Sequence, residues 1–429
     1  MTRITELSSV STSLSESIDL NPLIIDKRPR TSCFTTTMNL LNTLVGAEIL
    51  GIPNSMTFCG LTISVGLMTF AAILSYIATI FIIHLHRDTG FQTVNKITKN
   101  IIGKWGGNIY SLLALIFLFC CQVAYLVIGS ENITNWLTVF GYPEWSKGWR
   151  RSILVLAYSI VLPIALTIPR DHRFIVGAST SAVFIFSFYL AVMIYKGAQT
   201  FPTNGIASSV ELYKLDITIF NAFAIYTTAF AIPSVILPLL ENFPADLHSR
   251  YFLIGSSFIL CYVVVVIPST IAYLMFGEGT EVIVLASFDS REVIIQILRV
   301  LFFIVLNASY PVVTFVMMTD ISAIFFDAHN SVDLEPKKRA FVLFITNVFP
   351  VLLAMVLPSV RPILEIGGSF GGCLANFVFP PLLMFLHSKK KWYRISNLLL
   401  ILFAIFGLVS AGISTYQAVI DAIESITNF

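Results

Sequence analysis

The sequence predicts an all-α, polytopic membrane protein of about eleven helices, organised as a 5+5 inverted repeat with broken helices 1 and 6. The first observation is composition, since 56% of the 429 residues are hydrophobic and only 12% are charged. A soluble domain carries roughly 25% charged residues, so soluble enzymes are excluded and no enzymatic activity is expected. The other observations are apolar runs long enough to cross a bilayer, and breaks in the first and sixth runs.

Apolar runs of about 20 residues mark the predicted spans within one transmembrane domain, residues 34–429. Residues 1–33 are rich in Ser and Thr and lack the apolar stretch of a signal peptide. We expect them to form a disordered cytosolic tail. The spans are predicted at residues 34–58, 61–85, 108–130, 152–168, 174–196, 217–240, 251–276, 293–319, 340–359, 365–387 and 395–420.

The distribution of positive charge predicts the orientation of these spans. With the N-terminus placed in the cytosol, 18 of the 26 Lys and Arg residues fall in inner segments and 7 in outer ones. Short cytosolic loops carry such an excess, so the N-terminus is predicted to be cytosolic and the C-terminus extracellular or luminal. Arg299 falls inside the eighth span and is expected to snorkel outward. Asn132 begins a glycosylation sequon in the expected outer loop after the third span, which predicts a glycoprotein.

The first span is interrupted between Gly46 and Pro53 by two glycines, a carboxylate and a proline. An unpaired backbone group in hydrocarbon costs several kcal/mol, so a break of this kind occurs where it lines a cavity or lies buried in protein. In secondary transporters, such breaks form the substrate site.

A second interruption, with Pro233 and Pro238, lies in the sixth span. Proline removes a helix donor, so this stretch is either an ordinary kink or a second discontinuous helix. Breaks at corresponding positions favour an inverted repeat, with residues 34–196 as repeat one and 217–387 as repeat two. The run at 395–420 is then an extra helix.

Five stretches resemble the amino acid/auxin permease family, and together they extend over roughly residues 34–420. Asn42–Pro53 is similar to that family's first-span signature, although Glu48 stands where the family has a second glycine. Pro233 aligns with a frequent His, and Met318 with a frequent basic residue. The other four similar stretches are Val94–Gly107, Pro238–Asn242, Ala272–Gly277 and Ile366–Phe370.

The resemblance implies a fold of the bacterial leucine-transporter type and movement of amino acids coupled to H⁺ or Na⁺. In such a fold, the free N–H groups of a half-helix in the first span face the substrate carboxylate. Carbonyls of the sixth-span break face its ammonium group. The predicted substrate-binding residues are Gly46, Ala47, Glu48, Ile49, Leu50, Gly51, Thr227, Thr228, Phe230 and Ala231.

Glu48 is the carboxylate in the first break, and a charged group at that depth is a functional-site candidate by default. Three roles compete: proton acceptor for H⁺ coupling, counter-charge for a cationic substrate, and ligand for a bound cation. A structural hydrogen bond to a neighbouring span is the fourth. By the resemblance, Asn42, Asn307 and Ser309 lie near the family's cation site, where oxygen ligands suit Na⁺. The alternative for these three is interhelical hydrogen bonding.

The predicted function is secondary active symport of amino acids by alternating access around a midplane site. The alternatives are a non-transporting amino acid sensor and a transporter of another small organic amine. The partners are the amino acid and the lipid bilayer of a plasma, vacuolar or lysosomal membrane. No nucleic acid is expected as a partner, because the sequence has no basic tract suited to it. The six cysteines show no CxxC spacing, and no cofactor or metal is expected beyond a possible Na⁺ at Asn42, Asn307 and Ser309. A monomer is consistent with the sequence, which does not specify an oligomeric state.

Overall fold

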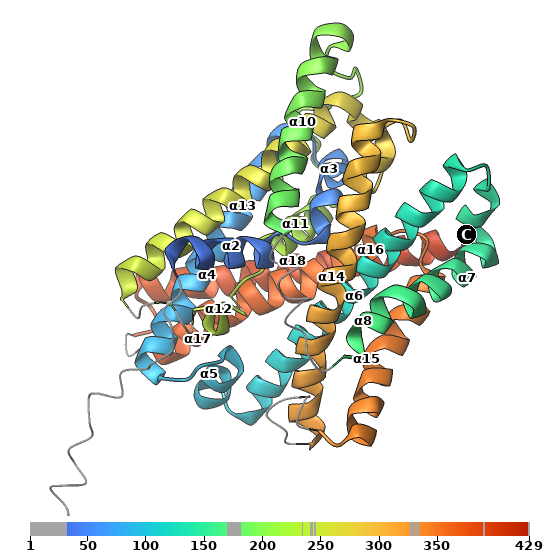
Figure 1. The fold of residues 1–429 in the computed structure, drawn as a ribbon. Helices are drawn as coiled ribbons and strands as arrows, with labels where there is room; N and C mark the ends of the chain where they lie inside the picture. The colour runs from blue at the N-terminus through green and yellow to red at the C-terminus, as the bar shows by residue number, and fades with distance from the viewer. Residues whose placement is uncertain are drawn as a thin grey trace, which may run out of the picture.

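The protein is helical throughout the residues that the structure describes, and no strand occurs among them (Figure 1). The structure is a computed structural model. The predicted N-terminal tail lies outside its described residues apart from its last two positions, and so do Glu241 and Asn242. The described residues are 32–169, 182–233, 235–240, 243, 246–326, 331, 334–388 and 391–427.

The helices follow one another with short connections. The first half contains α2 (Cys33–Leu44), η1 (Ala47–Leu50), α3 (Ile52–Ser55), η2 (Met56–Phe58), α4 (Leu61–Thr89), α5 (Val94–Ile101), α6 (Lys104–Val139), η3 (Pro143–Ser146), α7 (Gly148–Ser159), η4 (Ile160–Ile164), α8 (Ala165–Thr167) and α10 (Ala182–Asn204). The second half contains α11 (Ile219–Thr228), α12 (Ile236–Leu239), α13 (Leu247–Phe276), η5 (Gly277–Gly279), η6 (Val284–Ser287), α14 (Val293–Phe326), α15 (Pro336–Val356), α16 (Arg361–Gly367), η8 (Gly368–Val378), α17 (Phe379–His387) and α18 (Ile395–Thr427).

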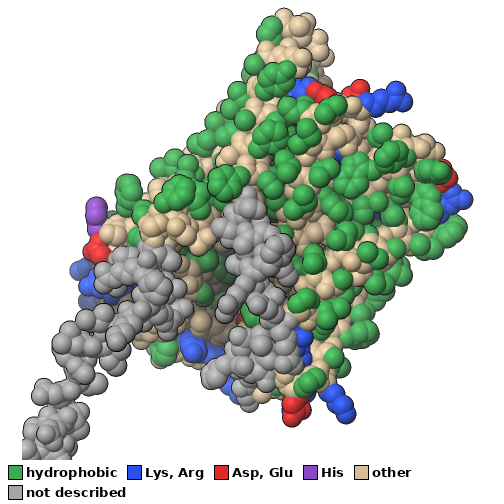
Figure 2. Space-filling model, viewed as in Figure 1, with side chains coloured by type: hydrophobic (Ala, Val, Ile, Leu, Met, Phe, Trp, Pro, Cys, Tyr) green, Lys and Arg blue, Asp and Glu red, His purple; other side chains and the backbone are tan. Residues whose placement is uncertain are grey.

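Nine helices in the described part of the chain are long and apolar enough to cross a membrane. They overlap nine of the predicted spans, and the first and sixth predicted spans are built from shorter helical pieces. The all-α, multi-pass prediction is confirmed. The exact number of eleven crossings and the inverted repeat stay predictions. Figure 2 shows hydrophobic side chains over the middle of the visible face, with most charged ones toward its ends, as expected for a protein surrounded by lipid.

The first span is broken where the sequence predicts it. Helix α2 ends at Leu44, and Val45 and Gly46 are extended, with φ −92° and −106°. The chain then forms the 3₁₀ turn η1 and resumes as α3, with Pro53 near its first position. Proline suits this position, where an amide donor has no intrahelical partner. The break therefore separates two helical segments around Gly46 and Glu48.

The sixth span is broken as well, which confirms a discontinuous helix rather than a kink. Helix α11 ends at Thr228, and the chain makes single turns before α12 begins at Ile236. The amides of Phe230 and Ala231 donate to the carbonyls of Thr227 and Thr228 at 3.2 Å, which closes these turns. The two prolines are thus accommodated in a non-helical stretch and a short helix.

The glycine-rich start of the tenth span brings it against α11. A π-helix, η8, occupies Gly368–Val378, between α16 and α17. A Cβ atom on Gly368 would lie 1.9 Å from the carbonyl oxygen of Ala224, and one on Gly372 would lie 2.0 Å from Thr227 Oγ1. Glycine is required here for close approach of the two backbones. This contact fixes the position of the sixth-span break.

Two predictions made from local sequence are wrong. Asn132 is not in an outer loop, because α6 continues to Val139 and the Asn132 side chain is 2% exposed. A buried helical asparagine is not accessible to a glycosylating enzyme, so the structure removes the basis for that modification. Arg299 does not snorkel outward. It is 1% exposed, and its Nη2 donates to the carbonyl of Leu285 at 2.7 Å.

Candidate functional site

A cavity of about 360 Å³ lies where the two broken spans meet. The first span contributes Glu48 and the sixth contributes Thr228, while α6, α10 and α14 supply mostly apolar walls such as Tyr125, Phe186 and Phe302. The volume is within the range of small-molecule sites, which are concave, largely apolar and carry few polar groups.

The structure brings part of the predicted substrate set to this cavity. Gly46, Glu48, Thr228 and Ala231 line it. Ala47 begins the 3₁₀ turn η1. The other predicted members pack outside the cavity: Ile49 and Leu50 in the hydrophobic core, Gly51 beside Leu364, Thr227 against η8 and Phe230 against Phe258.

Glu48 folds back onto the break from which it comes. Its Oε1 accepts a hydrogen bond from the amide of Gly46 at 3.1 Å. A Cβ atom on Gly46 would lie 2.4 Å from Glu48 Oε2, so the carboxyl group rests on the glycine backbone. The amide that the sequence assigned to a substrate carboxylate is therefore occupied by a carboxyl group of the protein itself.

Thr227 and Thr228 are adjacent in α11, but their side chains face different parts of the protein. Thr227 Oγ1 donates to the carbonyls of Ala224 at 2.7 Å and Gly368 at 3.3 Å, inside the contact with η8. Thr228 Oγ1 also donates to Ala224, at 3.2 Å, but this residue lines the cavity. Only Thr228 can contact a molecule in the cavity.

The three predicted cation ligands are not all in one place. Asn42 and Ser309 line the cavity together with Glu48. Asn307 faces α7 instead, accepting from the Tyr158 hydroxyl at 3.2 Å and donating to the carbonyl of Phe303 at 2.8 Å. For Asn307, the geometry matches the alternative of interhelical hydrogen bonding.

The charged lining of the cavity is acidic. Glu48 and Asp320 are its ionisable carboxyl groups, and no Lys, Arg or His occurs among the described lining residues. Within the described ranges, no group of three His, Cys, Asp or Glu side chains could hold a metal ion. An acidic cavity without a fixed positive charge favours a cation or a ligand with a positively charged group.

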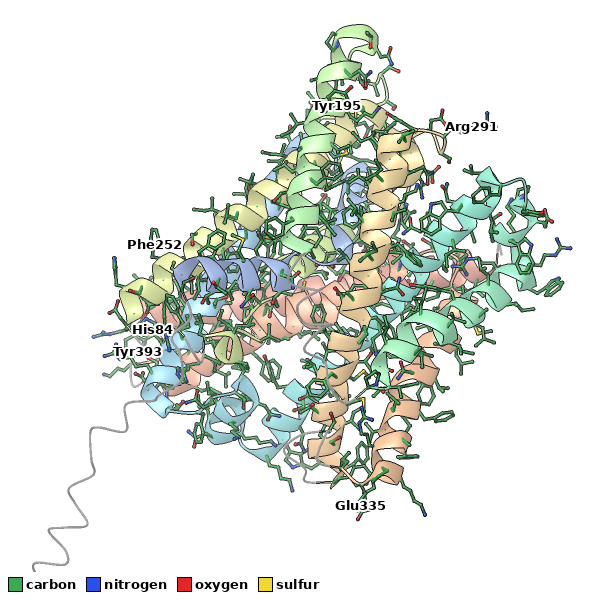
Figure 3. The ribbon with its side chains drawn as sticks, in the orientation of Figure 1. His84, Tyr195, Phe252, Arg291, Glu335 and Tyr393 are labelled. Atoms are coloured by element: carbon green, nitrogen blue, oxygen red, sulfur yellow. The ribbon has the colours of Figure 1, made fainter. Side chains whose placement is uncertain are left out.

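Among its described lining residues, the cavity extends toward the end of the molecule where α5 lies. Its lining continues to Asn95 in α5 and to Asp320 in α14, on the side where Figure 3 labels Glu335. Away from the α5 end of the cavity, a side-chain hydrogen bond joins α3 to α16. There Arg361 Nη2 donates to Asn54 Oδ1 at 2.8 Å. A molecule in the cavity is thus separated from the end opposite α5 by packed protein.

Sequence reasoning missed Glu365, which is 0% exposed on α16 and accepts from Asn221 Nδ2 at 3.0 Å. The signal was available, because it is an acidic residue bordering an apolar run. It was not recognised because the tenth span was predicted to begin at residue 365, which placed the carboxylate at a helix end. Helix α16 begins at Arg361 instead.

Comparison with known proteins gives one family match over most of the chain. The family described as "Transmembrane amino acid transporter protein" matches residues 29–420. Among curated relatives, the chain is 21% identical over 372 residues to sodium-coupled neutral amino acid transporter 7 of Danio rerio. That alignment covers 83% of this chain and 79% of the relative.

A human relative and a solved structure add to this match. Solute carrier family 38 member 10 of Homo sapiens is 22% identical, with 80% of this chain and 32% of that protein covered. The crystal structure of MhsT in complex with L-phenylalanine superposes with a TM-score of 0.54 at 14% identity, covering 91% of this chain and all of that one. At this identity the likeness shows the fold alone, which is that of the leucine-transporter type.

Proposed function

The chain belongs to the transmembrane amino acid transporter family, and on that premise we propose that it is a secondary active transporter. It moves amino acids by alternating access around the cavity, coupled to a cation. The observation that carries the proposal is the meeting of both broken spans at one cavity with acidic and no basic lining among the described residues. In transporters built this way, the breaks bind the substrate and the coupling ion.

Glu48 provides a physical reason why amino-acid binding is coupled to a cation. Its carboxyl group accepts from the Gly46 amide, the donor that a substrate carboxylate would use. Two carboxylates in one cavity of low dielectric repel each other strongly. An amino acid therefore binds after Glu48 is neutralised and moves off Gly46. A proton or a metal cation can neutralise Glu48 in this way, and so can the side chain of a cationic substrate.

We propose Na⁺ as the coupling ion, because relatives of this chain carry the name sodium-coupled transporters. Glu48, Asn42 and Ser309 line the same cavity and supply the hard oxygen atoms that such a cation prefers. H⁺ carried by Glu48 itself is the second candidate, favoured by the single carboxyl group at the break.

The arrangement of charges supports an N-terminus in the cytosol. In that orientation the α5 end is cytosolic, and the cavity extends toward the cytosol while the opposite end is closed by contacts such as Arg361 to Asn54. The structure would then represent an inward-facing state of the cycle.

Radiolabelled amino-acid uptake into proteoliposomes tests the proposal under an imposed Na⁺ gradient or pH gradient. We expect the wild type to concentrate substrate when one of these gradients is present. Glu48→Gln should abolish the response to the gradient, whereas exchange between internal and external substrate should persist. Glu335→Gln is a matched control, since Glu335 lies at the surface with its side chain 72% exposed.

The outcomes separate the alternatives. Binding of an amino acid without uptake under either gradient would contradict transport and support a sensor. Uptake of amines in preference to amino acids would contradict the proposed substrate. A Glu48→Gln variant that still follows the gradient would show that coupling resides elsewhere.

A further inference from the structure

The end of the molecule opposite α5 is held closed by Arg361, at the start of α16. Its Nη2 donates to Asn54 Oδ1 at 2.8 Å, and its guanidinium carbon lies 5.0 Å from the centroid of the Phe58 ring. Asn54 Nδ2 in turn donates to the carbonyl of Thr280 at 2.6 Å. These four residues connect the second half of the broken first span to the tenth span. We refer to Asn54, Phe58, Thr280 and Arg361 as the outer gate.

Glu365 lies one helical turn below this gate, four residues after Arg361. Its side chain is fully buried, and it does not line the cavity that holds Glu48. Its Oε2 accepts from Asn221 Nδ2 at 3.0 Å, while Oε1 is buried without a hydrogen-bond partner. Among the described residues, no basic side chain forms an ion pair with it. Burying a charged carboxylate with one amide donor costs free energy, whereas burying the protonated carboxyl group in the same place costs much less.

Few charged groups surround Glu365. Arg361 on its own helix and Asp421 on α18 act on it electrostatically. Helix α11 and the π-helix η8 carry no charged residue, and α6 carries Lys104 and Glu131 near its two ends. Other ionisable side chains on the elements packed against α16 are Tyr110, Cys120, Cys121, Tyr125, Tyr226, Cys373, Tyr416 and Glu424.

Arg361 is the cation that can reach Glu365. Side chains four residues apart on a helix are neighbours, about 5–6 Å apart at Cβ. In the structure the guanidinium is directed to Asn54, on another segment of the chain. If the outer gate opens, Arg361 loses Asn54 and can turn to Glu365, where an ion pair stabilises the carboxylate. Asn54 and Glu365 are thus alternative partners of the Arg361 guanidinium, Asn54 in the closed gate and Glu365 in an open one.

We propose that Glu365 is a proton-binding site that locks the outer gate. With the proton bound, Arg361 remains on Asn54 and the gate stays closed. When the proton leaves for the outer solution, the carboxylate pairs with Arg361, the contact with Asn54 breaks and α16 separates from α3. The inference rests on the proposed function, because a gate has this role only in a transporter. It assigns the proton a place distinct from Glu48.

Leu364 offers a reporter for the open gate. It is 5% exposed, and its Cδ1 lies 2.7 Å from where a Cβ atom on Gly51 would be, so it is covered by the first span. In Leu364→Cys, labelling by a membrane-impermeant thiol reagent from the outer side measures gate opening. The reactivity of a thiol itself rises with pH, so a reference rate is needed. The reference is the double variant Leu364→Cys, Asn54→Ala, in which the contact between Arg361 and Asn54 is removed. Each labelling rate is divided by the rate of this reference at the same pH.

We expect this ratio to fall at least tenfold when the outer pH is lowered from 7.5 to 5.5, since one linked proton allows up to about tenfold per pH unit. With Glu365→Gln added, the ratio should be low at both pH values. With Glu365→Asp it should stay pH-dependent. Glu335→Gln, at an exposed position, should leave the pH dependence of the wild type intact.

A ratio that still falls with pH in Glu365→Gln would overturn the proposal. If that variant does not reach the membrane, Arg361→Gln tests the same claim, because the carboxylate then lacks its partner and the pH dependence should be lost. Amino-acid uptake in the same vesicles separates the two proposals. Uptake with a pH-independent gate overturns this inference alone, whereas absence of uptake under either ion gradient overturns the proposed function.

Discussion

Glu48 and Glu365 are two carboxyl groups in broken or distorted spans, and they differ in their access to the cavity and in their hydrogen-bond partners. Glu48 lines the cavity and is bonded to the backbone of its own segment, at Gly46. Glu365 is fully buried outside the cavity and is bonded to another helix, at Asn221. The first group can meet a substrate or ion directly, whereas the second responds to how helices are packed. Depth in the membrane alone does not reveal which of these roles a carboxyl group has.

The largest effect is expected where the packing around Glu365 is disrupted. Gly368→Ala would place a Cβ atom 1.9 Å from the carbonyl oxygen of Ala224 and push η8 away from α11. We expect a loss of about 3 kcal/mol or more, at the upper end for overpacked sites. Thermal unfolding in detergent measures it. Gly412→Ala, where a Cβ atom meets nothing within 4 Å, is the control and should not destabilise the protein.

Removing the partner of Glu365 should have a smaller effect. Asn221→Ala leaves the Oε2 atom of Glu365 buried without a donor, which costs about 1–3 kcal/mol. The same thermal unfolding experiment measures this loss. Asn204→Ala, at the exposed end of α10, is the control. An unchanged unfolding temperature in Asn221→Ala would mean that Glu365 does not depend on its neighbouring helix, and the contrast with Glu48 would disappear.

The two adjacent threonines of α11 sharpen the comparison between cavity and packing. Thr228→Val changes a wall of the cavity, so we expect KM for uptake to rise about 2–10-fold with little change in stability. Thr227→Val removes hydrogen bonds to two carbonyls and should lower stability by about 1 kcal/mol while KM stays near the wild-type value. The reverse pattern would place the substrate on the other side of α11.

The smallest effect concerns a carboxylate outside the membrane. Asp246 caps α13, accepting from the amide and hydroxyl of Ser249 at 2.9 Å, and these hydrogen bonds lower the pKa of Asp246 below its ordinary 3.8. A lowered pKa stabilises the folded state above pH 3.8, and this contribution is lost as pH falls through the folded-state pKa. Asp246→Asn should remove this part of the pH dependence of the unfolding temperature, and an unchanged profile would exclude the cap as its source.

The sequence was sufficient for features that depend on local chemistry. Glycine and proline predicted the breaks at Gly46 and after Thr228, because each residue changes the backbone at its own position. The length of the apolar runs predicted the long helices. Glu48 was identified because its depth and its break are both visible in one short stretch.

Features that depend on distant contacts could not be predicted in the same way. Arg299 is buried with its guanidinium bonded to the carbonyl of Leu285, fourteen residues earlier, and Asn132 is buried within α6, which continues to Val139. The neighbours of Glu365 come from α11, far away in the chain. Hydropathy gave the depth of these residues but not the face of the helix on which they lie.

The most direct test of the central claim is equilibrium binding of an amino acid to purified protein with and without the coupling cation. The account predicts that Na⁺, or H⁺ if that is the coupling ion, strengthens wild-type binding at least tenfold, which is about 1.4 kcal/mol of coupling. In Glu48→Gln the amino acid should bind without the cation and the coupling should vanish, whereas Glu365→Gln should retain it. Coupling that persists in Glu48→Gln would contradict the role assigned to this carboxyl group.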